Sequence, residues 1–189
     1  MEFLTISETE NFGLTGHIYK YTLLINKEIS VKITIIAVGK LKEKFLRDGV
    51  NEYKKKLSHF CKLEIIEVND EPIPDNPNPS QESQVKGKEA KSILSKVKDG
   101  SWIVVLDIKG VKMSSEKLAS ELDKWMISGK SDITFIIGGS LGLGEEVLKK
   151  ANVSLSLSDM TFPHQLARLI LVEQIYRAFK IIRGETYHK

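Results

Sequence analysis

Short runs of hydrophobic residues alternate along the chain with longer stretches in which apolar positions recur every three or four residues. The short runs are rich in β-branched residues and predict strands, and the longer stretches predict amphipathic helices. Strands are expected at 31–38, 63–68, 102–108, 133–137 and 153–157, and helices at 41–58, 81–97, 115–128, 145–150 and 163–183. Because the strands are apolar throughout and alternate with helices, the pattern predicts an α/β fold with a mainly parallel sheet covered by helices on both faces.

The first 30 residues depart from this pattern. They mix polar residues and glycine with one short apolar run at 21–25, and they lack the basic start and long apolar centre of a signal peptide. Residues 31–189 are enough for one domain with a proper core. We therefore expect a single domain over 31–189, preceded by an extension over 1–30 that packs poorly and carries no catalytic residue.

Composition narrows the function classes. Hydrophobic residues make up 41% of the chain, but no apolar run approaches the ~20 residues that span a bilayer, so we expect a soluble protein without a membrane segment. Cys61 is the one cysteine, which excludes an intramolecular disulfide, favours the cytoplasm and leaves no Cys/His spacing for a metal site. The net charge of +3 permits RNA binding without arguing for it.

Prolines concentrate in one segment, 69–80, which holds four of the five in the chain. Proline withholds a backbone donor and favours extended chain, so a mobile surface loop is expected there. Two interpretations are open: a lid or RNA-contacting arm, and a plain connector between two elements.

Three loops follow expected strands and are candidates for one pocket. The first includes Leu106, the second is the glycine-rich run 138–144, and the third is 157–162. Loops at the carboxyl ends of parallel strands are where α/β folds bind ligands, and glycine lets a ligand approach the backbone. The glycine run matches neither a dinucleotide fingerprint nor a P-loop, so an anion cradle and a tight structural turn are both open. His164 stands at the entrance of the last helix, either as a packing residue or facing the pocket.

The last expected helix is apolar on more than one side. Its hydrophobic residues are Leu166, Leu169, Ile170, Leu171, Val172, Ile175, Tyr176, Phe179, Ile181 and Ile182. These cannot all face one sheet, so a second packing surface is needed, and the same helix of a second subunit would supply it in a two-fold dimer. Glu173 and Arg177 are four residues apart and are expected to pair; as a surface pair they would contribute about 0.3–0.5 kcal/mol.

Three pieces of sequence carry a resemblance to a known family: VKITIIAVGK from residue 31, FIIGGSLGL from 135, and LSLSDMTFPHQLARLILVEQIYRAFKIIRGETYHK from 155 to the end. Over 31–189 the chain resembles the SPOUT methyltransferases, and among them the YbeA-like family of 23S ribosomal RNA pseudouridine N3-methyltransferases. The resemblance implies a C-terminal trefoil knot, a homodimer, and S-adenosyl-L-methionine (SAM) bound in the knot. It also implies methylation of N3 of a pseudouridine in the intersubunit stem-loop of 23S ribosomal RNA, on the assembled 70S ribosome.

The resemblance also assigns roles to single residues. The implied cofactor contacts are Leu106, Gly138, Leu157, Ser158, Asp159, Met160, Thr161 and Phe162. N3 is a weakly acidic imide, so methyl transfer requires removal of its proton or stabilisation of the developing anion. In the terminal triplet, His188 is implied to accept that proton, Tyr187 to hydrogen-bond or stack on the base, and Lys189 to hold a phosphate or a uracil carbonyl. Further catalytic-site residues, implied to line or buttress it, are Arg168, Glu173 and Arg177.

The chain departs from the family in carrying Val31 where members begin with methionine. A valine codon can serve as a start, so residues 1–30 are interpreted as a mis-assigned start or a non-native extension, with a real extension as the alternative. Two other functions are weighed: a SPOUT enzyme with another target such as tRNA ribose, against which the Tyr-His-Lys end argues, and a non-catalytic ribosome-binding factor, which would not need the glycine loop. Phosphate contacts and plain solvated helix faces are equally supported for Lys40, Lys42, Lys44, Lys54, Lys55 and Lys56.

Overall fold

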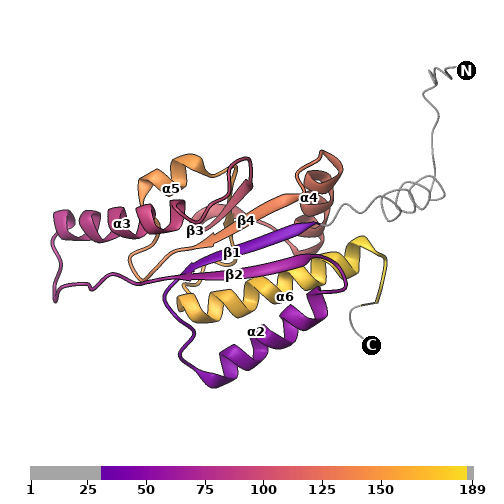
Figure 1. Cartoon of the computed structure of the whole chain (residues 1–189), viewed down its shortest axis with the longest axis horizontal. Coiled ribbons are helices and arrows are strands. Elements are labelled where there is room, and N and C mark those ends of the chain that lie inside the picture. Colours follow the sequence, from indigo (N-terminus) through magenta and orange to yellow (C-terminus); the bar gives the residue numbers. More distant parts are fainter. Residues whose placement is uncertain (1–30, 187–189) are drawn as a thin grey trace, which may run out of the picture. The chain divides into compact units, whose positions relative to one another are not determined.

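The computed structural model describes residues 31–186; the predicted extension 1–30 and the triplet Tyr187, His188 and Lys189 lie outside the described residues. The strands are β1 (Lys32–Val38), β2 (Lys62–Val68), β3 (Trp102–Lys112), β4 (Asp132–Ile137) and β5 (Val153–Ser156). The helices are α2 (Lys44–Leu57), α3 (Pro79–Leu94), α4 (Ser115–Ile127), α5 (Glu145–Lys150) and α6 (His164–Ile182). Figure 1 shows these elements as one alternating α/β arrangement.

The strands form one five-stranded sheet in the order β2-β1-β4-β3-β5. Each neighbouring pair is parallel, which confirms the predicted parallel sheet. The central strands β1 and β4 are buried along almost their whole length. Burying one Ile or Val side chain contributes about 1.5–3 kcal/mol, so these two apolar strands supply much of the stability of the sheet.

Helices cover both faces of the sheet, as predicted. On one face, Ile33 and Ile35 of β1 share a core with residues of α2, α4 and α6. On the other face, Ile36 and Val38 pack with residues of α3 and α5. In Figure 1, α2 and α6 accordingly lie below the sheet, and α3 and α5 lie above it. The alternation follows from the period of two along a strand, which sends successive side chains to opposite faces.

Several boundaries differ from the prediction by one to four residues, and two of these differences bear on the site. Helix α3 begins at Pro79, two residues before the predicted start, because Asn78 caps it. The Asn78 side chain accepts a hydrogen bond from the N–H of Gln81, and the Gln81 side chain accepts one from the N–H of Asn78, each at 2.9 Å. This leaves residues 69–78, the Pro-rich segment, without helix or strand. Strand β3 continues past residue 108 to Lys112, because the chain returns there to pair with β5.

The second apolar surface of α6 is partly explained within the chain itself. Helices α2 and α4 both pack against α6, and a β-carbon built on Gly49 of α2 would lie 3.0 Å from Leu169 of α6. Much of the surface that the sequence assigned to a second subunit is therefore covered by neighbouring helices. The half-buried residues that remain include Leu166 and Ile170.

Two further observations bear on the function classes. None of the helices in the described range is long and apolar enough to cross a membrane. Cys61 is buried immediately before β2, and burial raises the pKa of its thiol to about 12. The thiol is therefore protonated at neutral pH and unsuited to nucleophilic chemistry.

Candidate functional site

Of the three predicted loops, two directly follow β4 and β5, whereas the first, which begins at Leu106, lies within β3 because that strand continues to Lys112. Strands β4, β3 and β5 are adjacent and parallel, so their carboxyl ends lie together. Leu106 lies on β3 and pairs with Leu155 of β5, Gly138 directly follows β4, and residues 157–162 directly follow β5. The fold thus brings the candidate cofactor residues to the edge where parallel sheets bind ligands.

The glycine loop is a tight turn packed on its surroundings. The N–H of Gly142 donates to the carbonyl of Gly139 at 3.0 Å, and Gly142 has a φ of 82°, which a glycine adopts without strain. A β-carbon built on Gly138 would lie 2.9 Å from the carbonyl carbon of Gly142, and one on Gly144 would lie 2.9 Å from the carbonyl oxygen of Lys86. The structural-turn interpretation therefore accounts for these glycines, and a ligand contact at Gly138 would be an additional role.

The first loop is an excursion within β3. Leu106 pairs with Leu155, and after a register shift Val111 pairs with the same Leu155. The excursion, residues 107–110, brings Gly110 onto the backbone of β5, where an added β-carbon would lie 2.7 Å from the carbonyl carbon and oxygen of Ser154. Only a residue without a side chain allows this approach.

The third loop is shaped by its own hydroxyl groups. The Ser156 hydroxyl donates to the carbonyl of Ser158 at 3.0 Å, and the Ser158 hydroxyl accepts the N–H of Met160 at 3.0 Å. Asp159 forms an ion pair with Lys112 at the end of β3, a partner that the sequence did not reveal. Met160 is 73% exposed, Thr161 is exposed and Phe162 is half-buried, so this loop offers both polar and apolar surface.

A cavity of about 260 Å³ lies at the carboxyl end of β5, between the start of α4 and α6. Two of its lining residues are joined by a hydrogen bond, in which the Ser115 hydroxyl donates to Oε1 of Gln174 at 2.7 Å. Its lining is Met113, Ser114, Ser115, Leu118, Leu155, Ser156, Leu157, Ile170 and Gln174. Leu157 is the one predicted cofactor residue among them, and sequence reasoning missed the serine and glutamine side chains because they come from distant elements.

Glu173 and Arg177 do not line this cavity but connect to it through Gln174. They pair as predicted, with Nη2 of Arg177 2.7 Å from Oε1 of Glu173. The other carboxylate oxygen of Glu173 accepts from the side chain of Gln174 at 2.6 Å. Both side chains are more than two thirds buried, and the pair is hydrogen-bonded to a residue that lines the cavity. It is therefore not the exposed surface pair that was considered from the sequence.

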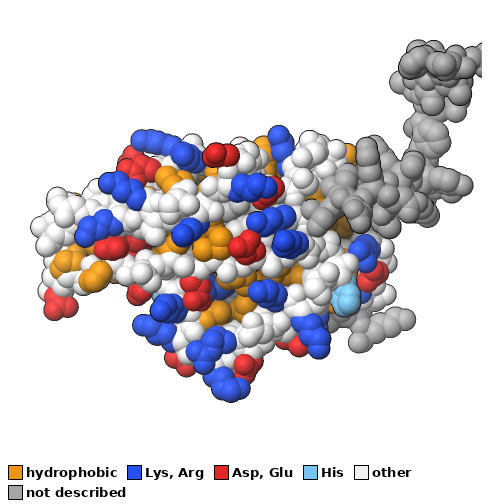
Figure 2. Space-filling view, in the orientation of Figure 1, with side chains coloured by type: hydrophobic (Ala, Val, Ile, Leu, Met, Phe, Trp, Pro, Cys, Tyr) orange, Lys and Arg blue, Asp and Glu red, His pale blue; other side chains and the backbone are white. Residues whose placement is uncertain are grey.

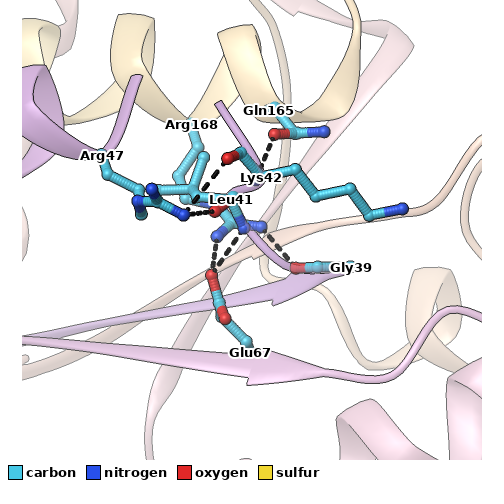
Figure 3. Close-up of polar contacts among 7 residues, drawn as sticks. All are labelled: Gly39, Leu41, Lys42, Arg47, Glu67, Gln165 and Arg168. Atoms are coloured by element: carbon cyan, nitrogen blue, oxygen red, sulfur yellow. Dashed lines mark hydrogen bonds and ion pairs between the residues drawn. The ribbon is translucent and has the colours of Figure 1, made fainter. Parts of the chain in front are cut away.

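Arg168 is fully buried and ties α6 to the loop after β1 (Figure 3). Its Nη1 donates to Oε1 of Glu67 at 2.6 Å, and its Nη2 donates to the carbonyl of Gly39 at 2.8 Å. Oε1 of Glu67 also accepts the N–H of Leu41 at 3.0 Å. Burial lowers the pKa of Arg168, and the neighbouring Glu67 opposes that shift. Arg168 buttresses the loop and does not line the cavity.

The same loop is held by two further side chains drawn in Figure 3. Nη1 of Arg47 donates to the carbonyls of Leu41 at 3.3 Å and Lys42 at 3.2 Å. The N–H of Lys42 donates to Oε1 of Gln165 at 2.9 Å. These bonds use the backbone of the loop, and the Lys42 side chain extends away from the cluster in Figure 3.

His164 packs beside this cluster and does not line the cavity. A β-carbon built on Gly39 would lie 3.0 Å from Nε2 of His164, so the imidazole lies against the end of β1. The pKa of His164 is lowered chiefly by burial and then by the positive charge of Arg168, whereas Asp70 opposes the shift. The packing interpretation of this histidine is thus the one its position favours.

This lowered pKa has a consequence for stability. A histidine that binds protons less tightly when folded contributes stability above its unfolded pKa of about 6.5, and that stability is lost as the pH falls. We expect acidification from pH 7.5 to 5.5 to destabilise the wild type more than His164→Gln, measured by urea denaturation at both pH values. Equal losses in the two proteins would contradict this expectation.

The terminal triplet has no described geometry, since Tyr187, His188 and Lys189 follow the described residues. Within residues 31–186, no group of three or more His, Cys, Asp or Glu side chains is arranged to hold a metal ion. The polar side chains that line the cavity are those of Ser114 and Ser115 at the start of α4, Ser156 of β5 and Gln174 of α6.

Known proteins resemble the chain over the region that holds all of these loops. A family model described as "Predicted SPOUT methyltransferase" matches residues 31–188. The protein named "Ribosomal RNA large subunit methyltransferase H" from Acetivibrio thermocellus is 62% identical over 159 residues, covering 84% of this chain and 100% of that protein. Proteins of the same name from Ruminiclostridium cellulolyticum and Alkaliphilus oremlandii are 59% and 55% identical over the same shares.

Proposed function

The chain belongs to the SPOUT methyltransferase family, and from this membership we propose that it transfers a methyl group from SAM to N3 of a pseudouridine in 23S ribosomal RNA. The target is the intersubunit stem-loop of the assembled 70S ribosome, in the cytoplasm. The observation that carries the proposal is the meeting of three segments at one edge of the sheet: the excursion within β3 and the loops after β4 and β5. The names of the relatives, which specify the large ribosomal subunit RNA, support the choice of substrate.

The residues at this edge fit SAM. Leu106 offers a half-buried apolar side chain, Gly138 presents backbone without a side chain, and residues 157–162 offer backbone groups beside the partly buried Phe162. Adenine and ribose are held by such combinations of apolar walls and a few directed polar groups. Bound SAM would supply an electrophilic methyl group on a positively charged sulfur. The chain's part is to bind, orient and shield it.

The proton at N3 must leave for the methyl group to be accepted. We assign its removal to His188, with Tyr187 binding or stacking on the base and Lys189 holding a phosphate or carbonyl oxygen. Hydrogen bonds connect Arg177 to Glu173 and Glu173 to Gln174, which lines the cavity. This row of polar side chains would orient Gln174 toward groups that enter the cavity. Arg168 acts at a distance, by fixing the loop after β1.

The histidine assignment is tested by His188→Ala. We expect this variant to bind SAM as the wild type does but to transfer methyl groups to purified 70S ribosomes about 100-fold more slowly, since general-base catalysis contributes factors of this order. Tritium transfer from labelled SAM measures the rate. His59→Ala, at an exposed position after α2, is the matched control and should keep full activity. Near-normal turnover of His188→Ala would remove His188 from this role.

We also propose the homodimer and the trefoil knot of the family. Half-buried Leu166 and Ile170 on α6, and Phe45 on α2, which is 67% exposed, support a second packing surface. The proposal of the knot rests on membership of the SPOUT family. Residues 1–30 are proposed to lie outside the catalytic domain.

Basic residues on and before α2 are the proposed contacts to ribosomal phosphates. Figure 2 shows Lys and Arg side chains over this helix. Two of the candidates form ion pairs with carboxylates of the same helix, Lys44 with Asp48 and Lys56 with Glu52. These two lysines are therefore less available to bind phosphate. The candidates for which the structure records no ion pair within residues 31–186 are Lys40, Lys42, Lys54 and Lys55.

A further inference from the structure

Glu89 is a buried carboxyl group that none of the roles above uses. It lies on α3 and is only 5% exposed. Its Oε1 accepts the N–H of Glu71, near the start of the Pro-rich segment, at 3.1 Å. Burial raises the pKa of Glu89, the bond from the Glu71 N–H opposes this shift, and the negative charges of Asp70 and Glu71 add to it.

The same carboxyl group touches the glycine loop. A β-carbon built on Gly139 would lie 3.0 Å from Oε2 and 3.1 Å from Oε1 of Glu89. Gly139 follows Gly138 directly and accepts the hydrogen bond from Gly142 that closes the turn. Glu89 therefore fills the space behind the loop whose first residue is the proposed SAM contact.

Burial of the Glu89 carboxyl group costs folding free energy. The nearest basic residue in sequence, Lys88, pairs with Glu71 at 3.5 Å instead, and in the described part of the chain the structure records no ion pair for Glu89. A buried carboxyl group without a cation loses solvation that an apolar side chain would not lose. The contacts of Glu89 with the Pro-rich segment and the glycine loop explain its presence better than stability does.

We propose that Glu89 is a positioning residue that joins the Pro-rich segment to the glycine loop and holds Gly138 and Gly139 in the arrangement that binds SAM. The inference rests on the proposed function of the glycine loop. Removing the side chain would free the N–H of Glu71 and leave a void behind Gly139, so the loop would lose its backing. A glutamine would keep both contacts, because its amide oxygen accepts the same hydrogen bond and fills the same space.

Two substitutions and one control test this proposal, with SAM affinity measured by calorimetry on the folded, full-length protein. We expect Glu89→Ala to weaken SAM binding about tenfold, since loss of a buried hydrogen bond partner has effects of this size. Glu89→Gln should stay within about twofold of the wild type by the same reasoning. Lys88→Ala, which removes only the exposed ion pair to Glu71, should bind SAM normally.

A further variant and a second readout separate positioning from general stability. Glu89→Asp keeps the charge but is one methylene shorter, and it should weaken SAM binding even if Glu89→Ala fails to fold. At saturating SAM the turnover of Glu89→Asp on 70S ribosomes should be near normal, so that the change falls on KM for SAM. Wild-type affinity in folded Glu89→Asp or Glu89→Ala would overturn the inference. Absence of SAM binding by the wild type would overturn the proposed function itself.

Discussion

Replacing Glu67 with alanine is expected to lower the free energy of unfolding by about 3 kcal/mol, because it leaves the buried guanidinium of Arg168 without its counter-charge. Arg168 is fully buried, and Nη1 lies 2.6 Å from Oε1 of Glu67. The substitution also removes the acceptor for the N–H of Leu41. The expected loss is at the lower end for buried pairs because Glu67 is itself 35% exposed. Urea denaturation of the two proteins measures the difference.

The matched control for this experiment is Glu64→Ala on the same strand. Glu64 pairs with Lys32 at 3.0 Å, but their side chains are 47% and 32% exposed. An exposed ion pair contributes at most about 1 kcal/mol, so this variant should lose little. Similar losses at the two positions would mean that the Arg168 cluster does not hold the loop after β1.

The second large effect is expected from Gly110→Ala. The new methyl group would lie 2.7 Å from the carbonyl carbon and oxygen of Ser154 and 2.8 Å from the carbonyl carbon of Leu155. These are backbone atoms, which cannot rotate away as a flexible side chain can, so either β5 or the excursion 107–110 must move. We expect a loss of about 3 kcal/mol in the free energy of unfolding. SAM affinity should fall as well, because Leu106 directly precedes the excursion and Leu157 directly follows β5.

Gly87→Ala gives the opposite expectation. Gly87 is inside α3, and a β-carbon there would meet nothing within 4 Å. Alanine is the better helix former by about 0.5–1 kcal/mol, so this variant should be slightly more stable than the wild type. Thermal unfolding of the two variants measures the difference: if Gly110→Ala is as stable as Gly87→Ala, Gly110 does not lie against the backbone of β5 as described.

Much of the fold could be predicted because it follows from local patterns. The apolar runs of β1 and β4 are long, β-branched and buried on both faces, and such runs between helices are typical of the central strands of a parallel sheet. The end of β3 could not be predicted, since residues 107–112 are mostly exposed and pair with β5 only after a register shift. Pairing between residues more than 40 positions apart leaves no periodic signal in either segment.

The loops of the candidate site could be predicted from the sequence, but the side-chain contacts that hold those loops could not. Loops after parallel strands meet at one edge by topology, so Leu106, Gly138 and residues 157–162 could be grouped once the strands were recognised. The cluster around Arg168 joins residues 101 and 129 positions apart, and the cavity depends on Gln174 meeting Ser115. Such contacts arise from tertiary packing, to which a single sequence gives no access.

Methylation of one pseudouridine of 23S ribosomal RNA by this chain can be read out by mass spectrometry of nuclease fragments of that RNA. The comparison is between a strain that carries the gene, a strain that lacks it, and the lacking strain complemented with the wild type or His188→Ala. We predict that one methyl group on one pseudouridine disappears with the gene and returns only with the wild-type copy. An unchanged methylation pattern in the strain that lacks the gene would contradict the proposed function.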